Sequence, residues 1–112
     1  MKVITVRFYA TTSGQEPVKQ WLINDINADD RKIIGQDLQT VEFGWPMGMP
    51  LVRKMEQNLW EVRSHISKGI ARVFFCVKEN NLVLLHGFIK KSQSTPKKAL
   101  KLAQKRRDEV LS

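Results

Sequence analysis

Three apolar segments in the second half of the chain are separated by tight turns, and this spacing constrains the fold more than any other feature. The segments are residues 58–66, 70–78 and 82–90, which are rich in β-branched and aromatic side chains. Gly69 separates the first two, and the pair Asn80-Asn81 separates the last two. Turns of this kind join neighbouring antiparallel strands. The sequence therefore predicts three adjacent antiparallel strands.

Two helices are predicted before these strands. The first begins near Pro17 and carries apolar residues at helical spacing as far as Ile26. Asn27 is suited to cap the second helix, which Gly44 ends. Because almost nothing separates the two helices, we expect them to form a helical hairpin.

Two further strands and one further helix complete the prediction. Residues 2–9 and 51–55 have strand character, and Thr95 followed by Pro96 is typical of a helix start. The length suits a single domain, residues 1–112. The predicted class is α+β: a twisted antiparallel sheet packed on an N-terminal helical hairpin, with a C-terminal helix.

Alternation of side chains sorts the three long strands into two predicted faces. One is almost entirely apolar, so we expect it to pack against the helices, with Gly87 letting a helix approach closely. It comprises Trp60, Val62, Ile66, Ala71, Val73, Phe75, Val77, Val83, Leu85 and Ile89, interrupted only by Ser64. The other mixes charged and aromatic side chains: Glu61, Arg63, His65, Arg72, Phe74, Cys76, Leu84, His86, Phe88 and Lys90.

The mixed face suits a ligand that carries both an anion and a base. Aromatic rings beside converging cations can stack a base and hold a phosphate. Purely structural interpretations stay open. Arg72 could form an ion pair with Glu61, because a cation in an apolar strand needs a partner. His86 could be a hydrogen-bonded core residue, and Lys90 and Lys91 could form a solvated strand end.

The net charge of +8 is unevenly distributed. Residues 1–50 carry five Lys or Arg against six Asp or Glu, whereas residues 51–112 carry fourteen against five. A basic half favours a polyanionic partner, although a basic surface can also serve solubility alone. We expect a cytoplasmic protein without membrane contact, because there is one cysteine and neither a signal-peptide core nor a membrane-length apolar run.

Several kinds of chemistry lack their sequence signature. The two histidines and the scattered carboxylates have no metal-ligand spacing, and no Gly-rich phosphate loop is present. Cys76 lies in mid-strand without the marks of an activated thiol. We therefore expect no cofactor. Metal-free acid–base chemistry remains, and RNA cleavage through its own 2′-hydroxyl fits it, since cations can stabilise the phosphate as charge develops.

The segment LWEVRSHISKGIARVFFCVKENNLVLLHGFIKKSQSTP resembles the RelE/HigB toxins of bacterial toxin–antitoxin systems, and among them the phage-derived RelE-like or HigB-like branch. The matching features are LWE-x-R on one strand, R-V-F-F on the next, and LHGF-x-KK-x-x-x-TP at the end of the last strand. The resemblance is specific over roughly residues 57–98. It implies a RelE-like fold and cleavage of mRNA, typically in the ribosomal A site. It also implies neutralisation by a cognate antitoxin, for which we expect a HigA-like helix-turn-helix protein that alone contacts operator DNA.

The resemblance also implies roles for particular residues. Arg63 and Arg72 would hold the phosphate and stabilise its charge, and Glu61 could be the base. His86, Lys90 and Lys91 lie where the family places its acid and further cations. The predicted RNA-binding residues are Arg53, Lys54, Phe88, Lys97, Lys98 and Lys101.

Two functions from other classes compete with RNA cleavage. ParE-like toxins of the same superfamily inhibit DNA gyrase and are not enzymes, and they do not need titratable groups to converge on one face. A basic nucleic-acid-binding module without catalysis would explain the helix KKALKLAQKRR through phosphate contacts alone. Many relatives stack a base on a tyrosine near the last strand. The only tyrosine here is Tyr9, so Phe88 or Trp45 would have to take that place.

Overall fold

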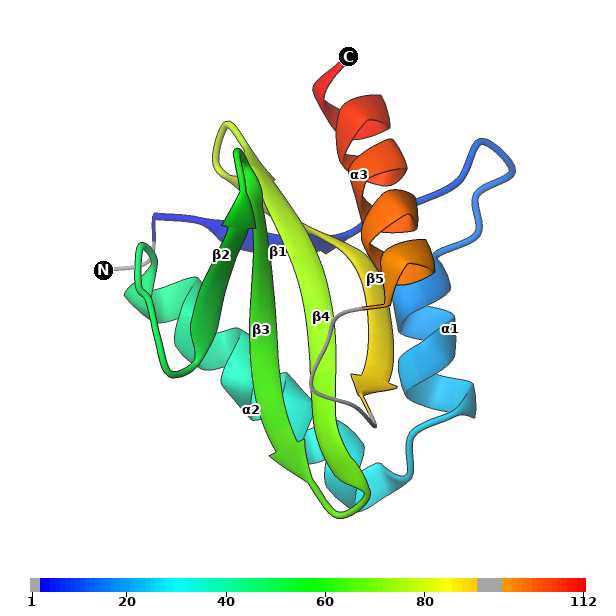
Figure 1. The fold of residues 1–112 in the computed structure, drawn as a ribbon, viewed down its shortest axis with the longest axis vertical. Coiled ribbons are helices and arrows are strands. Elements are labelled where there is room, and N and C mark those ends of the chain that lie inside the picture. Colours follow the sequence, from blue (N-terminus) through cyan, green and yellow to red (C-terminus); the bar gives the residue numbers. More distant parts are fainter. Residues whose placement is uncertain (1–2, 91–95) are drawn as a thin grey trace.

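A computed structural model of the chain describes residues 3–90 and 96–112. Its elements follow one another as strand, two helices, four strands and a final helix (Figure 1). Their bounds are β1 Thr5–Phe8, α1 Pro17–Asn24, α2 Ala28–Gly44, β2 Val52–Glu56, β3 Leu59–Ile66, β4 Gly69–Lys78, β5 Asn81–Lys90 and α3 Lys97–Leu111.

The strands form one five-stranded sheet in the order β1-β5-β4-β3-β2. The predicted antiparallel neighbours β3, β4 and β5 are confirmed, and β2 pairs antiparallel with β3. The prediction of a wholly antiparallel sheet is wrong, because β1 lies parallel to β5. No tight turn fixes the direction of β1, since both helices and three strands intervene before its partner.

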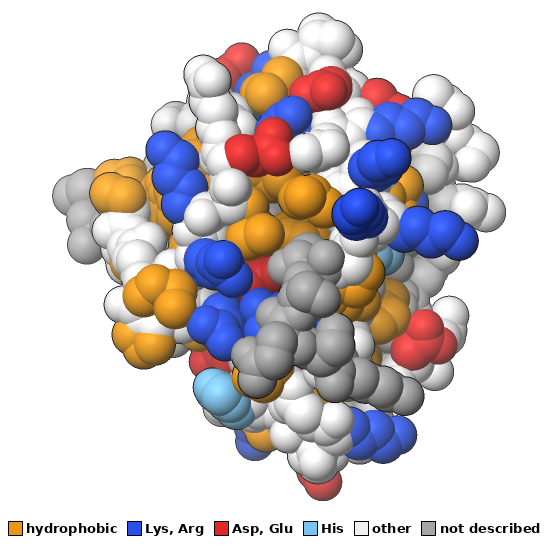
Figure 2. Space-filling view, in the orientation of Figure 1, with side chains coloured by type: hydrophobic (Ala, Val, Ile, Leu, Met, Phe, Trp, Pro, Cys, Tyr) orange, Lys and Arg blue, Asp and Glu red, His pale blue; other side chains and the backbone are white. Residues whose placement is uncertain are grey.

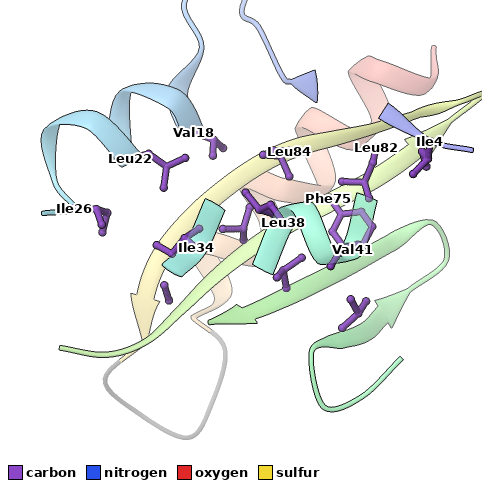
Figure 3. Packing of buried hydrophobic residues seen from close by; sticks show 14 residues of the cluster. Ile4, Val18, Leu22, Ile26, Ile34, Leu38, Val41, Phe75, Leu82 and Leu84 are labelled. Atoms are coloured by element: carbon purple, nitrogen blue, oxygen red, sulfur yellow. The ribbon is translucent and has the colours of Figure 1, made fainter. Parts of the chain in front are cut away.

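The helices lie on opposite faces of the sheet (Figure 1). We call the face covered by α1 and α2 the inner face and the face crossed by α3 the outer face. The main core fills the space between the inner face and the first two helices (Figure 3). It includes Val18 and Leu22 of α1, Ile34, Leu38 and Val41 of α2, and Phe75, Leu82 and Leu84 of the sheet.

Polar contacts fix where α2 begins. Asn27 caps the helix as predicted, because its Oδ1 accepts the Asp30 backbone N–H at 2.9 Å. The buried Asp30 carboxylate in turn accepts the Ser67 hydroxyl at 2.6 Å, which ties the helix to the β3–β4 turn. From the same end, Arg31 donates to the carbonyl oxygens of Leu22 and Ile26 at 2.7 and 3.0 Å. These contacts hold the end of α1, the start of α2 and the sheet together.

The predicted close approach at Gly87 is confirmed. A Cβ atom at this position would lie 2.5 Å from the Trp21 ring of α1. Real Cβ contacts are essentially never that short, so only glycine lets Trp21 lie against β5.

A β-bulge in β5 changes which face its residues occupy. Phe74 pairs with His86, but the next residue, Phe75, pairs with Leu84. The extra residue, Leu85, therefore lies on the same face as His86 instead of the opposite one. Strict alternation consequently gave the wrong faces before the bulge: Val83 and Leu85 lie on the outer face and Leu84 on the inner face. After the bulge, His86, Phe88 and Lys90 lie on the outer face, as predicted.

The outer face carries a second apolar core beneath α3. Its buried members are Tyr9, Leu59, Phe74, Cys76, Val83, Leu85, Ala99 and Ala103. The prediction that this face is mixed throughout is therefore wrong, because α3 covers an apolar part of it. Helix α3 begins at Lys97 after an extended Pro96. Thr95, the predicted cap, lies outside the described residues. None of the described helices is long and apolar enough to cross a lipid bilayer.

Candidate functional site

Strand register aligns the candidate residues on the part of the outer face that lies beside the apolar core beneath α3. Arg53 of β2 pairs with Glu61, and Arg63 of β3 pairs with Arg72. Lys90 pairs with Ile70 beside them. Directly paired residues point to the same side of a sheet. We call Arg53, Glu61, Arg63, Arg72 and Lys90 the cationic half, and the apolar core beneath α3 the apolar half.

A buried ion pair lies at the centre of the cationic half. The Arg72 Nη1 atom lies 2.6 Å from Glu61 Oε1, and the two side chains are 5% and 0% exposed. The structural alternative for Arg72 is thus confirmed as a contact. The contact does not exclude a functional role for Arg72, because Arg72 Nε and Glu61 Oε2 have no hydrogen-bond partner among the described residues.

Two arginines face each other across β3 and β4. Like charges placed directly opposite destabilise a sheet, and Arg63 and Arg72 are such a pair. The Nε atoms of both are buried and lack a hydrogen-bond partner among the described residues, as does Glu61 Oε2. Unpaired buried donors are unfavourable. An anion bound between the arginines would satisfy both the charges and the donors.

Lys90 completes the ring of cations around the single carboxylate. Its side chain is buried, and burial lowers the pKa of its amine. The positive charge of Arg72 lowers this pKa further, Glu61 opposes the shift, and Arg53 and Arg63 add smaller lowering effects. Lys90 therefore releases its proton more readily than an ordinary lysine.

His86 and Phe88 form the aromatic border of the cationic half. Their rings stack with centroids 5.7 Å apart, and Phe88 also lies 5.6 Å from Phe74. Burial lowers the pKa of His86, and Arg106 of α3 lowers it further, so the imidazole favours its neutral form. Sequence reasoning missed Arg106, because no pattern in the sequence indicates which residue of α3 reaches β5.

The other predicted residues are more dispersed. Lys54 pairs with Trp60, an inner-face residue, so its side chain leaves the sheet on the side opposite to the cationic half. Trp45 packs against Trp60 and Phe75 at 5.0 and 5.3 Å, which places it on the inner face and away from the site. Lys97, Lys98 and Lys101 are exposed on α3, and Lys91 lies outside the described residues.

Basic side chains reach the surface on this side of the sheet. In Figure 2, Lys and Arg side chains gather on this face next to hydrophobic ones. At the sheet edge, Arg63 and His65 also line a hollow of about 310 Å³ that reaches α2. Its other lining residues are Pro50, Leu51 and, from α2, Ile33 and Asp37. A larger hollow, about 610 Å³, lies between β1 and the end of α3 and is lined by none of the residues of the cationic half. We place the site by its convergent charges, since a phosphate chain needs a cationic surface more than a deep cavity.

Neither the cysteine nor the grouping of acidic and histidine side chains points to thiol or metal chemistry in the described part of the chain. Burial raises the pKa of Cys76 to about 11, so its thiol stays protonated at neutral pH. Within residues 3–90 and 96–112, no three His, Cys, Asp or Glu side chains are grouped so that they could hold a metal ion.

Comparison with protein families agrees with the sequence resemblance. The family of phage-derived Gp49-like proteins (DUF891) matches residues 22–108, which include the last turn of α1, the whole of α2 and every residue of the cationic half. A comparison with curated proteins finds no significant match. The family level of the resemblance is thus confirmed, and the HigB-like branch stays a prediction. The chain belongs to the Gp49-like family, a RelE/Gp49 toxin-like family of toxin–antitoxin systems.

Proposed function

We propose that this protein is the toxin of a type II toxin–antitoxin system and that it stops translation by cutting mRNA on the ribosome. Its partners would be the ribosome with its mRNA and a cognate antitoxin of the HigA-like helix-turn-helix class. Operator DNA would be contacted only through that antitoxin. Membership of a RelE/Gp49 toxin-like family supports the toxin role. The enzymatic role is inferred from the cationic half.

The observation that carries the proposal is the paired arginines with unfilled donors. Arg63 and Arg72 face each other, and both keep a buried Nε that no described residue accepts from. A phosphodiester between them would accept both donors and offset their repulsion. As the phosphorus becomes five-coordinate, its oxygens gain negative charge that these cations stabilise.

The reaction needs one group that takes a proton and one that gives a proton. The base removes the proton of the 2′-hydroxyl, the 2′-oxygen attacks phosphorus, and the bond to the 5′-oxygen breaks as the acid protonates it. The products are a 2′,3′-cyclic phosphate and a 5′-hydroxyl end. Lys90 and His86 suit these steps, since the pKa of each is lowered and both lie on the outer face, Lys90 within the cationic half and His86 at its border. Lys91, which follows Lys90 in the chain, would add a further cation.

Glu61 is better suited to positioning than to proton transfer. Its side chain is fully buried, and one of its oxygens is held by Arg72 at 2.6 Å. We therefore assign Glu61 the task of orienting the Arg72 guanidinium. The Phe88 ring is available for base stacking beside the phosphate site.

The enclosure of Glu61 and Arg72 also favours a second candidate. A ParE-like inhibitor of DNA gyrase would use the pair only for stability and would need no open reaction centre. This function predicts growth arrest without RNA cleavage.

A primer-extension map of a translated mRNA, made shortly after induction, tests the proposal. We would compare the wild type with Arg63→Gln, because Arg63 is only half-buried and has no ion pair among the described residues. Lys32→Gln is the matched control, since Lys32 is an exposed cation of α2, which lies on the opposite side of the sheet from the cationic half. New 5′ ends with the wild type and with Lys32→Gln, but not with Arg63→Gln, are expected. Growth arrest with intact mRNA would overturn the nuclease proposal and lead to a gyrase supercoiling assay.

A further inference from the structure

The β-bulge in β5 decides what His86 faces. If Leu85 were an ordinary ladder residue instead of a bulge, alternation from Leu84 would turn His86 to the inner face. The residue beneath Trp21 would then carry a side chain, although the space there admits only glycine. The bulge thus places His86 beside Phe88 and Gly87 beneath Trp21 at the same time.

A bulge leaves one backbone carbonyl outside the regular ladder, and here a side chain of α3 binds it. Arg106 Nη1 donates to the Leu85 carbonyl oxygen at 2.7 Å. The same guanidinium lies over the Tyr9 ring, with its central carbon 5.2 Å from the ring centroid. Tyr9 in turn donates its hydroxyl to Glu109, one turn further along α3. Arg106 is therefore held at two sides as it reaches the bulge.

We propose that Arg106 is a positioning residue that locks the bulge at Leu85 and so presents His86 to the substrate face. The role in catalysis rests on the proposed function, because it requires His86 to take part in cleavage. The structural part does not, because the orientation of His86 can be measured on the protein alone.

The surroundings of His86 make the effect specific. From β4 the directly opposite residue is Phe74, and from β5 the stacked neighbour is Phe88, neither of which is charged. Among the described residues, Arg106 of α3 is the charged group whose field acts on the imidazole. Loss of the Arg106 guanidinium should therefore change both the orientation of His86 and its titration.

Three variants separate positioning from charge and from general loosening of α3. Arg106→Met keeps an apolar stem and removes the guanidinium N–H donors. Arg106→Lys keeps the positive charge but replaces the planar guanidinium by an ammonium group. Arg107→Met is the matched control, because the neighbouring Arg107 binds Glu56 at 2.7 Å on β2 and not the bulge. His86→Gln assigns the NMR signals of His86, since the chain has only two histidines.

Nuclear Overhauser contacts and a pH titration of the purified protein give the first readouts. In the wild type and in Arg107→Met we expect contacts between the His86 and Phe88 rings. In Arg106→Met we expect these contacts to disappear and the pKa of His86 to rise, because a nearby positive charge and a fixed environment are lost. In Arg106→Lys the pKa should stay low and the contacts should return in part.

Cleavage in a purified translation reaction gives the second readout. A displaced catalytic group can reduce a rate about 10²-fold, so Arg106→Met should lose activity on that order and Arg106→Lys should recover part of it. Retained His86–Phe88 contacts in a folded Arg106→Met protein would overturn the proposal, even if the pKa moved. Equal losses in Arg106→Met and Arg107→Met would also overturn it. Absence of cleavage by the wild type would instead refute the proposed function and leave the result on the bulge intact.

Discussion

The two halves of the outer face are built on the same strands but differ in whether their buried polar groups have hydrogen-bond partners. In the apolar half, α3 covers the sheet, and its polar side chains find partners: Arg107 binds Glu56 at 2.7 Å, and Arg106 binds the Leu85 carbonyl oxygen. In the cationic half, Arg63 and Arg72 keep buried donors without a partner among the described residues. The difference supports the proposal that the apolar half stabilises the fold, whereas the cationic half retains unfavourable charges for an anionic ligand.

The largest effect is expected from breaking the central ion pair. Arg72→Met leaves the Glu61 carboxylate buried without its partner, which should lower the free energy of unfolding by about 3–5 kcal/mol. The double variant Glu61→Leu/Arg72→Met should regain most of this stability and still lack activity. Urea unfolding measures the first effect and mRNA cleavage the second. A double variant as unstable as the single one would contradict this description of the pair.

One substitution in each half should separate stability from cleavage activity. Leu59→Ala in the apolar half should cost about 2–5 kcal/mol, because Leu59 is fully buried, and cleavage per folded molecule should be unchanged. Lys90→Met should abolish cleavage while the protein stays folded, because methionine keeps a buried apolar stem of similar length and removes the amine of lowered pKa. Urea unfolding and initial cleavage rates on the same preparations decide the matter. Strong loss of rate in Leu59→Ala would show that the halves are not separable.

A smaller effect is expected at the inner face, on the strand that both halves share. Gly87→Ala places a methyl group 2.5 Å from the Trp21 ring and should destabilise the protein by about 1–3 kcal/mol. Gly35→Ala is the matched control, because no atom lies within 4 Å of its added Cβ and alanine favours a helix by about 1 kcal/mol. The melting temperatures of the two variants should therefore move in opposite directions. Equal shifts would exclude close packing at Gly87.

The smallest effect is the pH dependence that His86 contributes at the border between the halves. Its pKa is lowered by burial and by Arg106, so at mildly acidic pH the unfolded chain binds a proton that the folded protein does not. Stability should therefore fall as pH drops below the ordinary histidine value of about 6.5. His86→Gln should flatten this part of the curve, measured by urea unfolding between pH 7.5 and 5.5. The lowered carboxyl pKa values of Asp30 and Glu56 act at lower pH. An unchanged slope in His86→Gln would contradict the assignment.

Much of the fold follows from local signals in the sequence. Gly69 and the Asn80-Asn81 pair fix the antiparallel order of β3, β4 and β5, and Asn27 marks the start of α2. The direction of β1 does not follow, because it depends on packing at the far edge of the sheet and not on a turn. The coverage of part of the outer face by α3 was missed for a related reason. Ala99 and Ala103 indicate an apolar side of this helix, but no local signal indicates which face of the sheet that side packs against.

The candidate site follows from alternation only where the strands are regular. Glu61, Arg63 and Arg72 were grouped correctly because β3 and β4 pair without interruption. The bulge at Leu85 places the residues before it on the opposite face from the one that alternation predicts. No turn residue or proline indicates this bulge in the sequence. Arg106, which binds that bulge, became visible only once α3 was placed on the sheet.

The central claim is that the cationic half cleaves RNA through the 2′-hydroxyl. The chemistry of the product ends tests it most directly, in a purified translation reaction with the wild type, Lys90→Met and Lys32→Met. We predict 2′,3′-cyclic phosphate and 5′-hydroxyl ends with the wild type and with Lys32→Met, and their loss with Lys90→Met. Intact mRNA, 5′-phosphate ends, or full cleavage by Lys90→Met would contradict it.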